Sequence, residues 1–279
     1  MDETEILSDQ VIDDCVQSLH QSFQICHVGN SAFLATSYHI ERLALAIHNP
    51  AVVSALRIHN RLEVLVGMLL AIEGWRTFVL PNGLATNLEA SKQFLRVTFI
   101  LHTELTLITL INAMLIGTCN QLKEESSIAV IDYCARSMQV LGEPIHRNRV
   151  VLHQRLLAPS VSSIQDIILN AEFRSCILAA TTLVRNFCES FDDLSLSSQT
   201  RLLETRDLLM LLIPLIEEPP WTRKRVDKEA GKTWEKFIDN EWREVKKENL
   251  LKMVCTHCFR RFISLSDNIV SSPLRSDSV

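Results

Sequence analysis

The sequence predicts an all-α protein whose stacked helical hairpins form an armadillo-like superhelix, with a small β-hairpin inserted near 233–245. Apolar residues make up 47% of the 279 residues, and they recur at the spacing of buried helix faces. Glycine and proline number only 7 and 8, too few for a large β-sandwich or for glycine-rich phosphate loops. The helical pattern stops at Pro219-Pro220. This stop divides a helical-repeat-like body over 1–218 from a charged, tryptophan-containing segment over 219–245.

The first three helices are predicted by apolar stripes at 11–23, 40–47 and 62–72. Ser8 precedes the first stripe as an N-cap, where its hydroxyl can accept a hydrogen bond from a free backbone N–H. Asn49 and Pro50 end the second stripe, because a proline pushes the preceding residue out of the helical conformation. A turn at 81–83, with the sequence Pro-Asn-Gly, closes the third.

The remaining helices of the body are predicted over 95–119, 128–141, 162–190 and 198–218. Gly142 ends the second of these, in the position of a C-terminal cap. Short loops separate most of these helices, which is typical of stacked helical hairpins.

Two segments of the sequence resemble each other, as expected for a helical-repeat protein. The segment 62–75 aligns without gaps onto 208–221, and each is a short apolar helix that ends in a tryptophan, Trp75 or Trp221. Both resemble the buried third helix of an armadillo-type repeat, and Pro214 lies where such helices tolerate a bend. Because leucine-rich helices also match by chance, the alignment favours a true repeat and a coincidence equally.

The pattern changes after Pro220. Lys236 to Ile238 and Glu241 to Val245 form two short strand-like runs, and Asp239-Asn240 between them supplies a turn. Phe237 and Trp242 are expected to pack on the helical body. A helix over 246–265 and a disordered polar tail over 266–279 follow.

Neither a metal site nor a catalytic site is expected. Cys255 and Cys258 resemble half of a structural zinc site, but no second pair completes the four ligands, so we interpret them as core cysteines. His146 and His153 share a helix face with arginines and no carboxylate, which indicates a solvated basic face.

His102 and Glu104 interrupt the apolar helix over 95–119. A buried carboxylate there is either a general base with a shifted pKa or a partner in helix packing. Since no nucleophile or glycine-rich motif accompanies it, packing or an exposed edge position is the better interpretation.

The segment after Pro220 holds the candidate partner-binding residues. It carries twelve Lys or Arg against seven Asp or Glu over 219–262, whereas the whole chain has a net charge of −5. The 222–225 cluster suggests a solvated run, a nuclear-targeting signal or contact with an acidic protein surface, while the chain is too acidic for tight nucleic-acid binding. Tryptophans often anchor interfaces, and packing within the chain is the alternative, favoured for Trp221 and Trp242. The partner-binding set is Trp221, Arg223, Lys224, Arg225 and Trp234.

The eight cysteines predict a reducing compartment, because most lie in apolar helical settings. The acidic start of the chain does not fit a signal peptide. The longest uncharged apolar run, 105–117, is too short to span a bilayer, so a soluble protein without a membrane span is expected.

Several collinear motifs resemble the zinc-finger MYND-domain-containing protein 10 family, assembly factors for axonemal dynein arms. The resemblance runs from about 8 to 251, at low identity but in consistent order. It is carried by 71–75 (Ala-Ile-Glu-Gly-Trp) with Pro81, by His102-x-Glu104, by 131–134 (Ile-Asp-Tyr-Cys), by 193–197 (Asp-Leu-Ser-Leu-Ser) through Trp221, and by Trp242.

The resemblance implies a non-enzymatic cytoplasmic scaffold that helps chaperones preassemble axonemal dynein arms for motile cilia. It implies as partners Hsp90-class chaperones and co-chaperones, with axonemal dynein intermediate and heavy chains, and as location the cytoplasm, centriolar satellites or dynein assembly foci. The alternative is a generic armadillo-like protein–protein adaptor with a different client, because a fold does not determine its function.

The sequence departs from this family at its end. The family closes with a MYND finger that binds two zinc ions, and Cys255-x-x-Cys258 does not match it. A truncated chain and a diverged relative are both compatible with this departure. No zinc or other cofactor is therefore expected, and the leucine-rich-repeat co-factor that docks on the C-terminal half of the family stays in question.

Overall fold

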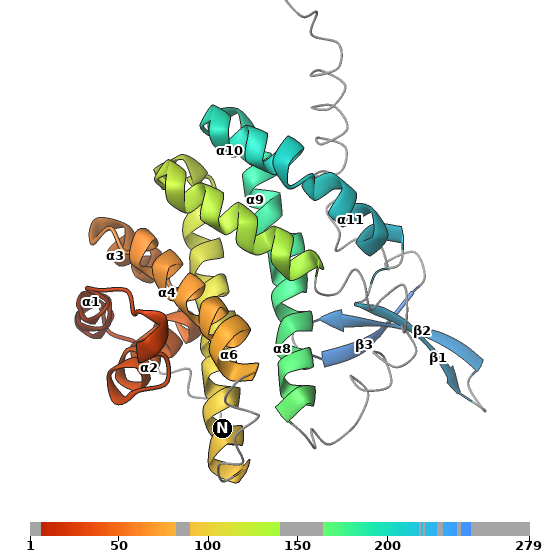
Figure 1. Ribbon diagram of the computed structural model, residues 1–279, viewed down its shortest axis with the longest axis horizontal. Coiled ribbons are helices and arrows are strands. Elements are labelled where there is room, and N and C mark those ends of the chain that lie inside the picture. The colour runs from red at the N-terminus through yellow and green to blue at the C-terminus, as the bar shows by residue number, and fades with distance from the viewer. Residues whose placement is uncertain are drawn as a thin grey trace, which may run out of the picture.

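A body of packed helices carries a small sheet on one side (Figure 1). The computed structural model describes residues 7–81, 90–139, 164–217, 219, 221–227, 231–238 and 241–246. The prediction of a mostly α-helical fold with a small β insertion is confirmed. The helix expected over 246–265, the tail over 266–279, and the predictions for Cys255, Cys258, His146 and His153 lie outside these residues.

The N-terminal part packs as α1 (Asp9–Ser18), a 3₁₀ turn (Ile25–His27), α2 (Ser31–Leu45), α3 (Pro50–Ile58) and α4 (Leu62–Gly74). Asn30 caps α2 by accepting from the Phe33 amide at 2.8 Å. Ser8 occupies the N-cap position of α1, but its side chain makes no capping hydrogen bond.

Helix α3 was not predicted. The sequence marks Pro50 as the end of a helix, and it also begins the next one, because proline at the first helical position needs no N–H partner. The Asn49 side chain completes this start by accepting from the Ala51 amide at 3.0 Å. Asn49 and Pro50 therefore separate two consecutive helices.

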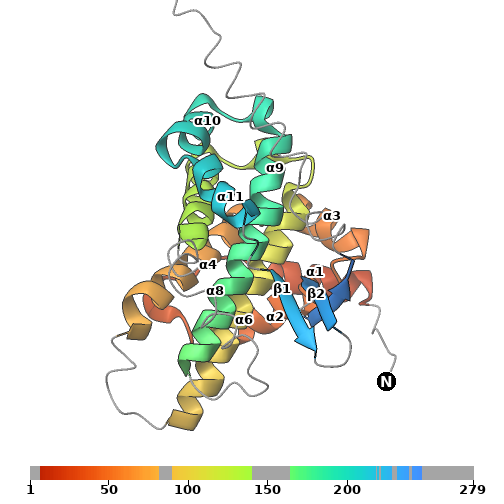
Figure 2. The ribbon, with the colours of Figure 1, turned by 90° about the vertical axis from the view of Figure 1, so that its right-hand side faces the viewer.

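The middle of the chain forms the central helices. After α4 a π-helical turn (Trp75–Val79) continues the helix through Pro81, and the rest of the predicted 81–83 turn lies outside the described residues. Helix α6 (Ala90–Leu115) follows, then a 3₁₀ turn (Cys119–Gln121) and a helix over 124–139. Helices α6 and α8 (Ile164–Leu178) run side by side through the body, as Figure 2 also shows.

The predicted helix over 162–190 is continuous from 164 to 189 and includes a π turn, whereas the predicted helix over 198–218 is interrupted. The first contains α8, a π turn (Ala179–Leu183) and α9 (Val184–Glu189), and a 3₁₀ turn (Phe191–Asp193) follows it. The second divides into α10 (Leu196–Thr200) with a π turn (Arg201–Thr205), and α11 (Leu208–Glu217). Asp207 separates the π turn from α11, because it adopts a φ of 44° and its side chain accepts from the Met210 amide at 3.2 Å.

The sheet has three antiparallel strands, β1 (Thr222–Asp227), β2 (Gly231–Ile238) and β3 (Glu241–Val245), in the order β1-β2-β3. The predicted hairpin is confirmed as β2 and β3, whose Phe237↔Trp242 and Ile238↔Glu241 pairs leave 239–240 as the connection. The basic cluster at 222–225, interpreted from the sequence as a solvated run, is instead most of a third strand.

Helix α6 forms the centre of the hydrophobic core. By length and composition its Phe94–Leu115 part could cross a membrane, and half of its most apolar stretch is buried in the protein. The helix contacts α2, α3, α4 and α8, and these contacts account for its apolar composition. The tryptophans of the internal similarity, Trp75 and Trp221, are both buried, while the armadillo-type superhelix itself stays a prediction.

Candidate interaction surfaces

A buried ionic cluster joins the central helices. Glu104 of α6 is fully buried, and its Oε1 accepts from the Tyr133 hydroxyl at 2.9 Å and from Arg76 Nη2 at 3.2 Å. Arg76 also donates through Nη1 to Glu172 Oε1 of α8 at 3.1 Å. The cluster therefore links the π turn after α4, helix α6, the 124–139 helix and α8.

Burial dominates the electrostatics of this cluster. It raises the pKa of Glu104 and of Glu172, although the Arg76 guanidinium opposes the shift in both cases. Burial alone would lower the pKa of Arg76, but the Glu104 and Glu172 carboxylates more than offset it and the pKa is raised. One cation thus serves one fully buried and one partly exposed carboxylate.

The cluster is closed to substrates. The Glu104 side chain is 1% exposed and that of Arg76 is 10% exposed. His102 does not join it, because its ring is half exposed on another face of α6, with Nε2 3.7 Å from Glu41 Oε1. The structure therefore favours the packing interpretation of Glu104 over that of a general base.

Three further ion pairs connect the 124–139 helix to its neighbours. Asp132 accepts from Arg201 at 2.7 and 2.6 Å and from Arg206 Nε at 2.7 Å. Arg136 binds Glu73 of α4 through two hydrogen bonds of 2.7 Å. These pairs were not predicted from the sequence, where Asp132 and Arg136 are charged residues within an apolar helical pattern.

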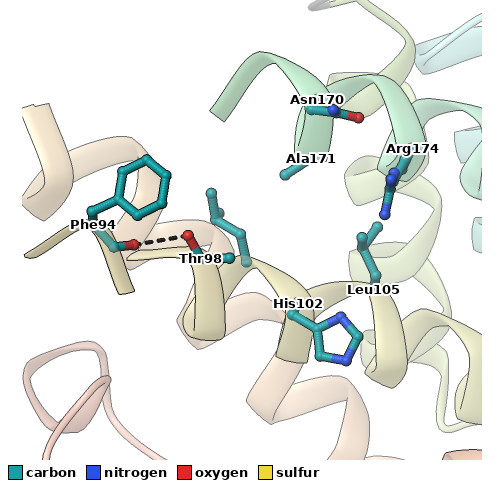
Figure 3. A pocket seen from close by; sticks show the side chains of 8 residues that line it. Phe94, Thr98, His102, Leu105, Asn170, Ala171 and Arg174 are labelled. Atoms are coloured by element: carbon teal, nitrogen blue, oxygen red, sulfur yellow. Dashed lines mark hydrogen bonds between the residues drawn. The ribbon is translucent and has the colours of Figure 1, made fainter. Parts of the chain in front are cut away.

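A groove opens between α6 and α8 with a volume of about 280 Å³ (Figure 3). We call it the α6–α8 groove, and it is lined by Phe94, Thr98, Leu101, His102, Leu105, Asn170, Ala171 and Arg174. The Thr98 hydroxyl donates to the Phe94 carbonyl at 2.8 Å, so it is satisfied within its own helix. Figure 3 shows the Arg174 side chain reaching from α8 toward Leu105.

The α6–α8 groove combines an apolar wall with the Arg174 guanidinium. Leu101 and Ala171 are buried and Leu105 is half-buried. Burial lowers the pKa of the Arg174 guanidinium, which is thus partly withdrawn from water. Such a groove suits an apolar side chain of a bound segment with a carboxylate beside it.

The predicted partner-binding residues do not form one surface. Trp221 is completely buried, so its ring belongs to the core in agreement with the packing alternative. The Arg223 side chain is 15% exposed; it forms an ion pair with Glu235 and lies 4.3 Å from the centre of the Trp242 ring. The position of Arg225 is defined by the backbone of β1, and its side chain lies outside the described part.

Lys224 and Trp234 are the members of the set that lie together near the surface. They are paired across β1 and β2, with Lys224 Nζ 5.5 Å from the centre of the Trp234 ring. Lys224 is exposed and Trp234 is half-buried. Trp242 stacks on Phe173 of α8 with 6.4 Å between ring centres, as expected for a residue that packs on the body.

No group of three or more His, Cys, Asp or Glu arranged to bind a metal ion occurs within the described ranges. The described cysteines are buried except Cys26. Burial raises the pKa of the Cys119 thiol to about 11 and that of Cys176 to about 12, which disfavours the thiolate form that binds metals.

The chain is similar to a curated protein. No protein-family model matches the sequence, and no solved structure matches the fold. The zinc finger MYND domain-containing protein 10 homologue of Drosophila melanogaster is 29% identical over 194 residues, which cover 67% of this chain and 40% of that protein. The chain thus spans about two fifths of the length of this relative. The resemblance recognised in the sequence is confirmed, because the chain is similar to this zinc finger MYND domain-containing protein 10 homologue over 194 residues.

Proposed function

We propose that this chain is a non-enzymatic cytoplasmic adaptor that assists chaperone-dependent preassembly of axonemal dynein arms. The observation that carries the proposal is the 29% identity over 194 residues to the Drosophila zinc finger MYND domain-containing protein 10 homologue. The resemblance described from the sequence supplies the dynein role. Its proposed clients are axonemal dynein intermediate and heavy chains, and its other proposed partners are Hsp90-class chaperones.

The packing of the helical body and the α6–α8 groove on it support an adaptor role. Buried and partly buried ion pairs join its central helices, so these helices form a connected framework. The α6–α8 groove offers an apolar wall and the Arg174 guanidinium at the surface of this framework. Such surfaces suit recognition of a protein segment and need no bound metal.

The experiment is affinity purification of the tagged chain from ciliated cells, followed by mass spectrometry. We expect dynein chains and Hsp90-class chaperones to be recovered. Thr98→Arg should reduce this recovery, because the new side chain would occupy the α6–α8 groove from an exposed position. Thr98→Ala is the matched control, since it keeps the groove open, and it should recover the same partners as the parent chain.

The second candidate function is a generic adaptor with a different client. It is favoured by the small part of the Drosophila protein, 40%, that this chain matches. Because the chain spans 40% of that protein, contacts made by the other 60% cannot be assigned to this chain. Recovery of other proteins from folded chain, with dynein chains and chaperones absent, would support this candidate. That outcome would contradict the dynein role.

A further inference from the structure

The register of the sheet separates its side chains into two faces of different charge. Across the strands Thr222 pairs with Lys236 and then Arg243, and Lys224 pairs with Trp234 and then Val245. Because side chains alternate along a strand and paired residues share a face, all six lie on one face. We call this the cationic face. Its Lys224 and Arg243 are exposed, whereas Lys236 is only 3% exposed. The pairing of Ile238 with Glu241 assigns position 241 to the same face.

The opposite face packs on the helical body. Trp242 stacks on Phe173 of α8, and the Arg223 guanidinium lies over the Trp242 ring while it pairs with Glu235. Glu244 occupies the same face, next to Glu235 across the sheet. Glu235 and Glu244 therefore share the face of Trp242, and the cationic face points away from Phe173.

The cationic face holds an aromatic ring among its charges. Trp234 lies at its centre, with the exposed Lys224 ammonium 5.5 Å from the ring centre. Arg243 and Lys246 are exposed at the β3 side of the sheet, and burial lowers the pKa of Lys236 beside Trp234. A half-buried indole ring beside the exposed Lys224 suits a segment that carries both carboxylates and an apolar side chain.

We propose that the cationic face, centred on Lys224, Trp234 and Arg243, is a docking surface for an acidic segment of a partner protein. Charge complementarity identifies the occupant: the 219–262 stretch has twelve Lys or Arg and seven Asp or Glu, in a chain of net charge −5. An acidic segment is repelled by the rest of the chain and attracted here, so its approach is directed to the sheet. The few accessible cations favour a carboxylate segment over a nucleic acid, whose binding requires a longer cationic track.

The inference rests on the proposed function only because a client-binding adaptor needs a docking surface. It is tested with purified full-length chain and a fluorescent twelve-residue peptide of alternating Glu and Leu with one central Phe. We expect Lys224→Glu to weaken binding by about tenfold, roughly the effect of one close charge pair. Binding should also weaken as salt is raised. Lys123→Glu is the matched control, since Lys123 is exposed outside the sheet and the change in net charge is the same.

Two further probes make the outcome decisive. A peptide with Gln in place of Glu should bind weakly, and so should a twelve-nucleotide single strand. Trp234→Ala should weaken peptide binding with the melting temperature retained. Equal losses in Lys224→Glu and Lys123→Glu, equal binding of the Gln peptide, or tighter binding of the oligonucleotide would each overturn the proposal. Dynein recovery that persists in Lys224→Glu, without peptide binding, would reject this surface and keep the proposed function.

Discussion

The Tyr133 hydroxyl donates to Glu104 Oε1 at 2.9 Å inside the helical body, and both side chains are completely buried. The two residues are 29 positions apart and come from different helices. The other carboxylate oxygen of Glu104 has no hydrogen-bond partner. The hydroxyl is therefore one of two donors, with Arg76, that compensate a buried charge.

Tyr133→Phe is expected to destabilise the protein by about 1–3 kcal/mol, the cost of leaving a buried acceptor without its donor. Urea unfolding monitored by circular dichroism measures this change. Tyr38→Phe is the control, because Tyr38 is 56% exposed and its hydroxyl remains accessible to water. Equal stability of the two variants would show that the Glu104 contact contributes nothing.

Arg76→Met is expected to cost about 3–5 kcal/mol, because it leaves two partly or fully buried carboxylates without their shared cation. Adding Glu104→Gln should recover part of this loss, since the second change removes the uncompensated charge. A double-mutant cycle in the free energy of unfolding tests the coupling. Strictly additive losses would contradict an interaction between Arg76 and Glu104.

The pH dependence of stability is expected to have opposite signs at two sites. Although burial raises it, hydrogen bonds from Arg201 and Arg206 hold the pKa of Asp132 well below its usual 3.8. The Asp132 contribution is therefore present above pH 3.8 and lost as the pH falls below that value. Burial raises the pKa of Glu104 and Glu172, so their contribution is present below their usual 4.5 and lost as the pH rises.

Asp132→Asn separates these two effects. It should destabilise the protein by about 2 kcal/mol at pH 7, as for hydrogen bonds to a charged group, and by less at pH 3. Unfolding at each pH measures the difference. Asp193→Asn, a change at an exposed carboxylate, should leave both values near those of the parent chain. A loss of stability that is the same at both pH values would contradict the assigned role of Asp132.

Thiol alkylation should modify Cys26 before the other described cysteines. Cys26 is exposed, whereas Cys15, Cys119, Cys134, Cys176 and Cys188 are buried. Burial keeps these thiols from the reagent and disfavours their thiolate form. Timed labelling with peptide mapping by mass spectrometry shows the order. Modification of Cys134 or Cys176 in folded protein as fast as Cys26 would contradict the described packing.

The two sheet tryptophans should have separable effects. Trp242→Ala removes the ring that stacks on Phe173 and lies beneath Arg223, so we expect a loss of about 2 kcal/mol of stability. Trp234→Ala removes a half-buried ring on the other face, and we expect weaker peptide binding with little change in stability. Thermal unfolding and fluorescence titration of both variants measure the two quantities. A larger loss of stability for Trp234→Ala would reverse the assignment of the faces.

Periodicity predicted most helices because it depends on near neighbours in the chain. The stripes at 11–23, 62–72 and 128–141 correspond to α1, α4 and the helix over 124–139. Sequence signals predicted the ends of helices less well. Pro50, for example, both ends one helix and begins α3. The positive φ of Asp207 likewise divided a continuous apolar pattern.

Strand β1 shows where local reasoning failed. The 222–227 segment lacks the alternation of apolar and polar residues that predicts a strand, so its cations suggested a solvated run. Backbone pairing with β2 makes it a strand, and Glu235 and Trp242 provide partners for Arg223. These partners come from other strands and could not be recognised from the 222–227 sequence.

The sequence by itself determined the helical class, the break at Pro219-Pro220, the β2–β3 hairpin and the resemblance to zinc finger MYND domain-containing protein 10. These depend on periodicity, turn residues and collinear motifs, which are properties of the chain. Only the tertiary structure decided that Glu104 is neutralised by Arg76, that Trp221 lies in the core, and that Lys224 and Trp234 share a face. The physical reason is that charge compensation and burial depend on groups far apart in the sequence, whose meeting is set by helix packing and strand register.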